Sequence, residues 1–163
     1  MGKYEEALVE LKKGLDVFVT VHGQEHLDVA KTKENMAIVY QQQGLYDQAL
    51  ELYNSVLETK VRVVGHNHPL VASSYNNIGA VYTEKGDLEN ALLQNQRALE
   101  IKTRVYGQEH PDVAVSNFNM AVVYRSLEHA EVAKEMFTKA YSIFLKVLGP
   151  DHPHTQQAKS QVD

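Results

Sequence analysis

The stretch from Gly65 to Ala72, GHNHPLVA, decides how this chain folds, because close copies of it recur at a fixed interval. Copies begin at Gly23 (GQEHLDVA), at Gly107 (GQEHPDVA) and, in a shorter form, at Gly149 (GPDHPHT). Each copy starts 42 residues after the one before it. Self-similarity at a fixed period is the signature of a repeat architecture. We therefore expect stacked units rather than one globular core.

Each unit contains two segments whose apolar residues recur at the helical spacing of three and four residues. In one unit Val71, Tyr75, Ile78 and Tyr82 form the first pattern, and the second runs through 88–105. No strand-like alternation is present. The pattern predicts seven helices and a short terminal one, at 3–20, 27–42, 47–62, 69–84, 89–104, 111–126, 131–146 and 153–161.

Residues that start and stop helices agree with this division. The prolines of the repeated stretch stand where a first helical residue tolerates a missing N–H, and the histidine before each one suits a cap position. Gly44 and Gly86 lie between the two helices of their units, where a left-handed residue can end a helix. The third unit has Glu128 at this position. We therefore expect a different turn there and looser packing in residues 126–134.

Small residues recur where the two helices of a unit should meet. By their place in the repeat, Ala49, Ala91 and Ala133 on the second helices face small residues on the first helices, which are Ala37, Gly79 and Ala121. Two helices approach closely only where side chains are small, so a leucine at Ala91 should be overpacked. One helix pair cannot bury its apolar stripe alone, and we expect the pairs to stack with one concave face left open.

These residues resemble a tetratricopeptide repeat, and in particular the 42-residue variety of kinesin light chains and nephrocystin-like proteins. The motif consists of G-x-x-H-P-x-V-A, then N-[LIM]-[AG]-x-V-Y, then G-x-[YL]-x-x-A-[LV] and A-L-E-I. The resemblance covers nearly the whole chain. It implies an all-α fold, a right-handed α-solenoid of stacked antiparallel helix pairs.

The expected division is one array with incomplete units at both ends. It comprises an unpaired second helix (1–22), three repeats (23–64, 65–106 and 107–148) and a partial repeat containing a first helix (149–163). Two readings of the ends stay open. The chain is cut from a longer array, or one chain's last helix completes the next chain's first helix and gives end-to-end self-association.

In the resembled family the first helices line a peptide-binding groove, and the asparagine of the central motif points into it. Carried over, this gives Asn35, Asn77 and Asn119, with Gln161 in the same phase. Neighbours on the same face complete the predicted site: Lys31, Ile38, Ser73, Ala80, Val115 and Val122. A carboxamide offers donors and an acceptor to the backbone of an extended peptide. The alternative is that these asparagines only join adjacent helices.

Charge supplies the second expectation about the ligand. Kinesin light chains carry a basic residue near the end of the second helix that meets acidic peptides, and this position holds Lys60 and Lys102 here but Phe18 and Phe144 in the outer units. The lysines would attract acidic segments in a salt-sensitive manner. We expect Glu34 and Glu84 at the edge of the groove to dilute this field. The resulting expectation is an extended, acidic, aromatic-containing peptide.

Composition excludes several other classes of function. A formal net charge of −5 argues against nucleic-acid binding, which needs a basic field. No apolar run is long enough to span a membrane. The absence of cysteine removes disulfides and thiolate metal sites and fits a reducing, cytoplasmic setting. Without a catalytic or phosphate-binding motif, we expect no enzyme and no cofactor.

Eight histidines raise the question of a metal site. Four occupy one repeat position and are better explained as helix-start residues, although pairs such as His22 with His26 could chelate weakly. We therefore expect no metal. The predicted function is a protein-binding scaffold whose partner is a protein or peptide. The alternatives are a self-associating assembly scaffold and the partner-sensing arm of a larger signalling protein.

Overall fold

The computed structural model describes residues 2–162, and all the regular secondary structure in this part of the chain is helical. Its eight helices are α1 (Gly2–His22), α2 (Leu27–Gln42), α3 (Tyr46–Val64), α4 (Pro69–Lys85), α5 (Leu88–Tyr106), α6 (Pro111–Ser126), α7 (Ala130–Leu148) and α8 (Pro153–Lys159). The predicted helices are confirmed, with each boundary within two residues. No helix among residues 2–162 is long and apolar enough to cross a membrane.

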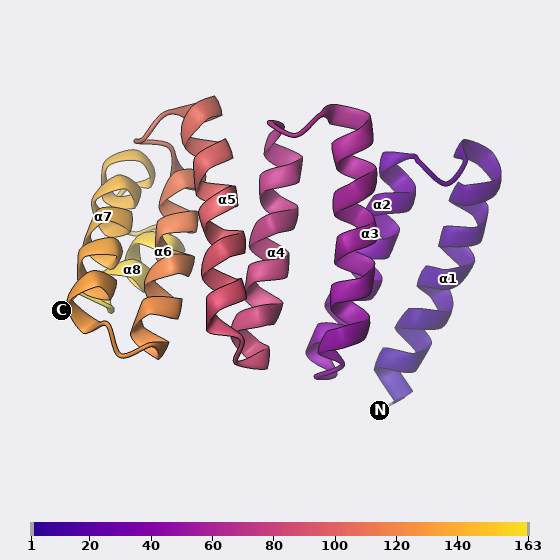
Figure 1. Ribbon diagram of the computed structural model, residues 1–163, viewed down its shortest axis with the longest axis horizontal. Coiled ribbons are helices and arrows are strands. Elements are labelled where there is room, and N and C mark those ends of the chain that lie inside the picture. Colours follow the sequence, from indigo (N-terminus) through magenta and orange to yellow (C-terminus); the bar gives the residue numbers. More distant parts are fainter. Residues whose placement is uncertain (1, 163) are drawn as a thin grey trace.

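The helices follow one another in a row, with the two termini at opposite ends of the molecule (Figure 1). The principal contacts join helices that are neighbours in sequence, and α4 also contacts α6 directly. The array is therefore open and does not close into a bundle. Helices α2, α4 and α6 are the first helices of successive pairs, and we call the face they present the helix A surface.

The apolar core is divided among the helix pairs. One cluster joins α2, α3 and α4 through residues such as Ala37, Ala49 and Ile78, and another joins α6 and α7 through Ala121 and Ala133. These recurring alanines are at most 2% exposed, so the close helix contacts predicted for them are present. A core in separate pieces is expected of units that contact only their neighbours.

The repeated histidines cap the first helix of each unit, as predicted. In His26, His68, His110 and His152 the Nδ1 atom accepts a hydrogen bond from the backbone N–H two residues later, at 3.1–3.2 Å. Each side chain thus satisfies one of the free donors at a helix start. The preceding connection holds a left-handed glycine each time, with φ between 81° and 84°.

The turn at Glu128 corrects one prediction. Glu128 has a φ of 63°, close to Gly44 (73°) and Gly86 (85°). The residue after each one donates its N–H to a tyrosine carbonyl five residues back (Tyr40, Tyr82 and Tyr124), at 2.9 Å in all three turns. The expectation of a different turn was wrong, because this hydrogen bond holds Glu128 in the left-handed region that glycine occupies in the other units.

Candidate functional site

The helix A surface contains the predicted groove residues. Lys31, Asn35 and Ile38 lie on α2, Ser73, Asn77 and Ala80 on α4, and Val115, Asn119 and Val122 on α6. The carboxamides of the three asparagines belong to half-buried residues, so they are not sealed inside the core. Gln161 lies in a turn after α8, which ends at Lys159. The expected helix to residue 161 is therefore two residues too long.

A buried ion pair lies at the α2 end of this surface. The carboxylate of Glu34 contacts Lys60 Nζ through Oε1 at 3.1 Å, and both side chains are less than 10% exposed. Its oxygens also accept hydrogen bonds from Asn77 Nδ2 at 2.9 Å and from Lys31 Nζ at 3.2 Å. Glu34 was expected at the edge of the groove, but it is buried inside the structure. Its negative charge compensates the positive charge of Lys60. Asn77 also joins α4 to α2 through its hydrogen bond to Glu34. This is the alternative role that the sequence left open for the asparagines.

The second lysine of the predicted basic pair has a different environment. Lys102 is 4% exposed, and position 76, which corresponds to Glu34, holds Asn76. Burial lowers the pKa of Lys102, because the charged ammonium is removed from water, and the field of Asp112 opposes part of this shift. The Nδ2 of Asn76 donates to Ser116 Oγ at 3.3 Å, while its Oδ1 is buried without a partner. The two lysines are thus not equivalent.

A pocket of about 250 Å³ opens on the helix A surface between α4 and α6. Its lining residues are Ala80, Thr83, Glu84, Asn95, Asn119 and Val122. Three of them are predicted groove residues, and Glu84 was expected at the groove edge. Asn95 belongs to α5 and is 1% exposed, and its Oδ1 has no hydrogen-bond partner. The pocket therefore has mainly apolar walls, and the unpartnered Asn95 Oδ1 lies buried behind them.

A smaller pocket of about 120 Å³ lies further along the same surface, between α6, α7 and α8. It is lined by Val115 and Asn119 together with Phe118, Phe144, His154 and Gln157. Asn119 borders both pockets, so the structure brings together the predicted residues of α6 at this point. A broader depression of about 700 Å³ is lined by α7 alone, mostly by charged and polar side chains, and offers no enclosed site.

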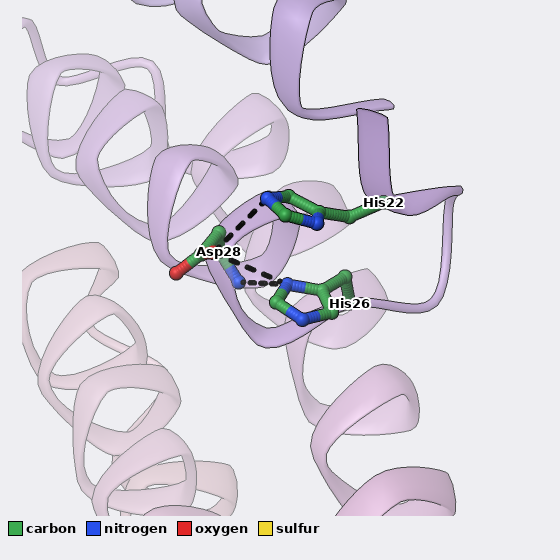
Figure 2. Close-up of side chains that lie close together, drawn as sticks. All are labelled: His22, His26 and Asp28. Carbon is green, nitrogen blue, oxygen red and sulfur yellow. Dashed lines mark hydrogen bonds and ion pairs between the residues drawn. The ribbon is translucent and has the colours of Figure 1, made fainter. Parts of the chain in front are cut away.

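Three side chains around the connection between α1 and α2 lie close enough together to hold a metal ion: His22, His26 and Asp28 (Figure 2). The Asp28 Oδ2 lies 3.3 Å from His26 Nδ1 and 3.7 Å from His22 Nε2. However, His26 Nδ1 already accepts the capping N–H of Asp28. The stacking of His22 on His26 is matched at the same repeat positions by Tyr106 on His110. The cluster is therefore explained by helix capping and ring packing.

In the pocket between α4 and α6, Thr83 and Asn95 are the residues that reasoning from the sequence missed. A signal for them was present in the repeat. The position of Asn95 holds Tyr53 in the preceding unit and Phe137 in the following one, and the position of Thr83 holds Gln41 and Arg125. The middle unit has a shorter side chain than its neighbours at both positions. This indicates a space in the middle unit that the other two units fill with their own side chains.

Comparison with known proteins agrees with this architecture. A family model described as tetratricopeptide repeat matches residues 1–60, 28–104 and 94–146. No curated protein matches the sequence. The solved structure of BtubC (BKLC) from P. vanneervenii is similar, with 28% identity and a TM-score of 0.81 over 93% of this chain. The match covers 60% of that protein, so this chain spans less than two thirds of its length.

Two further structures are similar in fold. A putative kinesin light chain from Podosopora anserina has 21% identity and a TM-score of 0.78, covering 99% of this chain and 76% of that one. The N-terminal domain of stress-induced protein-1 (STI-1) from C. elegans has 16% identity and a TM-score of 0.60, covering 84% and 97%. The expected all-α, right-handed solenoid with kinesin light chain-like repeats is confirmed.

Proposed function

The chain belongs to the tetratricopeptide repeat family and has the fold of a protein–protein interaction scaffold, and we propose that it binds an extended segment of a partner protein along the helix A surface. The observation that carries the proposal is the pocket between α4 and α6, which is lined by Ala80, Asn119 and Val122. Predicted groove residues from two successive units therefore meet at one concave site.

The chemistry of this surface suits an extended peptide. Half-buried carboxamides occur at equal intervals on α2, α4 and α6. A carboxamide can donate to a peptide carbonyl and accept from a peptide N–H, so it supports backbone binding without reading side chains. The two pockets beside Asn119 then supply places for ligand side chains. The proposal assigns no catalytic step to the chain and places its activity in the cytoplasm.

We propose only a weak preference for an acidic ligand. Two lysines without carboxylate partners would give a stronger one. Glu34 already holds Lys60 at 3.1 Å, so that lysine contributes little net charge to the surface. Lys102 has no such bond to a neighbouring carboxylate on α4, because Asn76 replaces Glu34 there. We therefore place the positive contribution near Lys102. We expect binding to depend more on an aromatic residue in the ligand than on its acidic residues.

The test compares binding of the wild-type chain and an Asn77→Leu, Asn119→Leu variant to an array of short peptides of varied sequence. The variant should lose most of the spots that the wild type binds. A variant with Asn54→Leu and Gln96→Leu, two exposed positions on the second helices, is the matched control and should retain them. Circular dichroism establishes that all chains are equally helical. An unchanged array pattern in the groove variant would mean that another surface binds the peptides.

Asn119→Leu alone is a necessary companion, because Asn77 also bonds Glu34. The single substitution leaves that bond in place, so a loss of binding cannot be assigned to a disturbed ion pair. We expect it to remove peptides that rely on either pocket.

Self-association is the second candidate, and one observation favours it. Helix α1 has no buried residue, and several of its large apolar side chains are exposed (Tyr4, Val9, Val17, Phe18 and Val21). Light scattering over a wide range of chain concentrations tests this candidate. Self-association is supported if the measured mass rises with concentration in the wild type and if the Val17→Asp, Val21→Asp variant keeps the mass of a single chain. The mass of a single chain throughout removes it.

A further inference from the structure

An ion pair recurs near the end of the second helix in two of the three complete units. In the first unit, Arg62 on α3 pairs with Glu25 in the connection before α2. In the third unit, Lys146 on α7 pairs with Glu109 in the connection before α6, at 2.6 Å. Both pairs use the same two repeat positions and join a second helix to the start of the first helix of its own unit.

The middle unit has the cation of this pair but not the carboxylate. Arg104 on α5 occupies the basic position, and Asn67 occupies the acidic one. Arg104 Nη1 donates a hydrogen bond to Asn67 Oδ1 at 2.8 Å. Because a carboxamide carries no charge, this bond leaves the positive charge of Arg104 uncompensated.

A second arginine lies two helical turns earlier on α5. The guanidinium of Arg97 lies over the ring of Tyr75, 5.6 Å from its centre, and this cation–π contact holds it in place. Ser55 and Lys139 occupy the position of Arg97 in the other units. In the described part of the chain, neither arginine of α5 forms an ion pair.

Both arginines line a pocket of about 210 Å³, together with Tyr75 and with His66 and Asn67 from the connection before α4. The arginines are seven residues apart and therefore lie on the same side of α5. None of the predicted groove residues lines this pocket. Tyr75 and Asn77 are two residues apart on α4, which places their side chains on nearly opposite sides of that helix. The pocket is therefore separate from the helix A surface.

One carboxylate also lines the pocket. Glu100 lies between the two arginines in sequence, and its Oε1 accepts a hydrogen bond from Gln96 Nε2 at 3.2 Å. With two guanidinium groups and one carboxylate, the pocket stays positive in a chain whose formal net charge is −5. A ligand with a single negative charge gains little here, because Glu100 repels it. The pocket therefore favours a compact group with two negative charges.

We propose that this pocket binds the phosphate group of a phosphorylated serine or threonine on a partner protein. A phosphate monoester carries a charge of about −1.5 to −2 at pH 7 and has three acceptor oxygens. One phosphate can therefore accept hydrogen bonds from both guanidinium groups, whose paired N–H donors match its geometry. A carboxylate has two oxygens and one charge and would serve one arginine. The ring N–H of His66 is a further donor among the lining residues.

The expected occupant is a protein rather than a nucleic acid. The fold is that of a protein–protein interaction scaffold, and the net charge of −5 opposes the binding of a long polyanion. The side chains of Arg97, Arg104 and His66 belong to exposed residues, so a side chain of another protein reaches them without a change in the helices. This inference does not depend on the proposed groove function, because it concerns a different surface. It makes binding of the partner dependent on phosphorylation.

The test uses three capped peptides of sequence Gly-Gly-X-Gly-Gly, in which X is phosphoserine, serine or glutamate. Each is titrated into the ¹⁵N-labelled wild-type chain, and the backbone amide and arginine Nε–H signals are followed by nuclear magnetic resonance. The phosphoserine peptide should give saturable shifts at His66, Asn67, Arg97 and Arg104. The glutamate peptide should bind at least about tenfold more weakly, and the serine peptide should not bind. No saturable shift with phosphoserine, or equal affinity for glutamate, would overturn the inference.

Three variants test the contribution of each charge. Asn67→Glu restores the acidic residue of the other units and gives Arg104 its ion pair, so affinity for the phosphoserine peptide should fall about tenfold. Arg97→Gln should weaken binding by a similar factor. Glu100→Gln removes the repulsion and should strengthen it. Unchanged affinity in both Asn67→Glu and Arg97→Gln would contradict the assignment of the pocket.

Arg62→Gln is the matched control. It lowers the net charge by as much as Asn67→Glu does, and it acts at the repeat position of Arg104 in the first unit. Binding of the phosphoserine peptide should be unchanged in this variant, and circular dichroism establishes that all variants are equally helical. Equal losses in Arg62→Gln and Asn67→Glu would show attraction by overall charge and would remove the specific site.

Two further probes identify the source of the phosphate. A short oligothymidylate should not displace the phosphoserine peptide, and inorganic phosphate should bind no more tightly than the peptide. Displacement by the oligothymidylate, or tighter binding of inorganic phosphate, would overturn the assignment to a phosphorylated protein. The Asn77→Leu, Asn119→Leu variant should bind the phosphoserine peptide as the wild type does. Failure of the groove function and failure of this site are therefore separate results.

Discussion

The helix pairs α2–α3 and α4–α5 have the same backbone plan but different interiors. The first pair has the buried Glu34–Lys60 ion pair. At the same two repeat positions the second pair has Asn76 and a buried Lys102. The α6–α7 pair places Phe118 and Phe144 at the same positions, packed in one apolar cluster. The comparison teaches that the stack tolerates ionic, polar or aromatic contents, provided that the recurring small residues and the caps remain.

The largest expected effect separates the two lysines. Lys60→Met leaves the buried Glu34 carboxylate without its main counter-ion and should lower the free energy of unfolding by about 3 kcal/mol, the lower end for a broken buried pair, because Lys31 and Asn77 still bond Glu34. Lys102→Met removes a buried charge that has no such bond and should be neutral or stabilising. Urea denaturation measures both.

The double variant Glu34→Met with Lys60→Met is the control for this pair. Removing both charges should recover most of the stability lost in Lys60→Met. Equal losses in the two single lysine variants would show that the environments of Lys60 and Lys102 do not differ as described.

The second prediction concerns what the two pairs share. Ala49→Leu and Ala91→Leu each insert a large side chain at a position with no exposed surface, and each should cost about 1–3 kcal/mol through overpacking. Thermal and urea unfolding measure the loss. Because the close helix contact is common to both pairs, the two costs should agree. Leucine at the exposed Gln48 is the matched control and should change stability little.

A smaller effect is expected at the turn between α6 and α7. Glu128→Gly relieves an L-residue held at a φ of 63° and should raise the free energy of unfolding by about 1 kcal/mol. The reverse change, Gly86→Ala, should lower it by a similar amount. Amide hydrogen exchange should remain faster in residues 126–134 than in 84–92 in the wild type and should slow in Glu128→Gly. Equal exchange in the two turns would refute the looser packing.

The smallest effect is a titration in the α2–α3 pair that the middle pair lacks. Burial and the fields of Glu34 and Glu84 raise the pKa of Tyr53 to about 12. The folded state therefore favours the neutral phenol. Stability from this preference is complete below the unfolded pKa of about 10 and is lost as the pH rises through 12. Phenolate absorbance should show a late-titrating tyrosine that Tyr53→Phe removes.

The sequence predicts the helices well because periodic residues determine them. Recurring histidines, prolines and glycines mark most of the starts and stops, and the structure agrees to within two residues. The site is less predictable, because it depends on residues that do not recur. Glu34 was expected at an exposed edge, and its burial follows from contacts with Lys60 and Asn77, which come from two other helices.

Asn95 shows where a better sequence argument was available. Its tyrosine and phenylalanine counterparts occupy the same repeat position, so the missing ring could have been inferred by comparing units in phase. The volume of the resulting pocket could not, because it also depends on the separation of α4 and α6 and on the short Thr83 side chain.

The repeated histidine caps and left-handed turns have a consequence for how such a protein can change over generations. The caps and turns determine the path of the backbone. The side chains packed between the helices are determined by other residues, which are those at positions 34, 41, 53 and 60 and their counterparts in the other units. Because the two sets of residues hardly overlap, mutations can diversify recognition one unit at a time while the architecture is inherited intact.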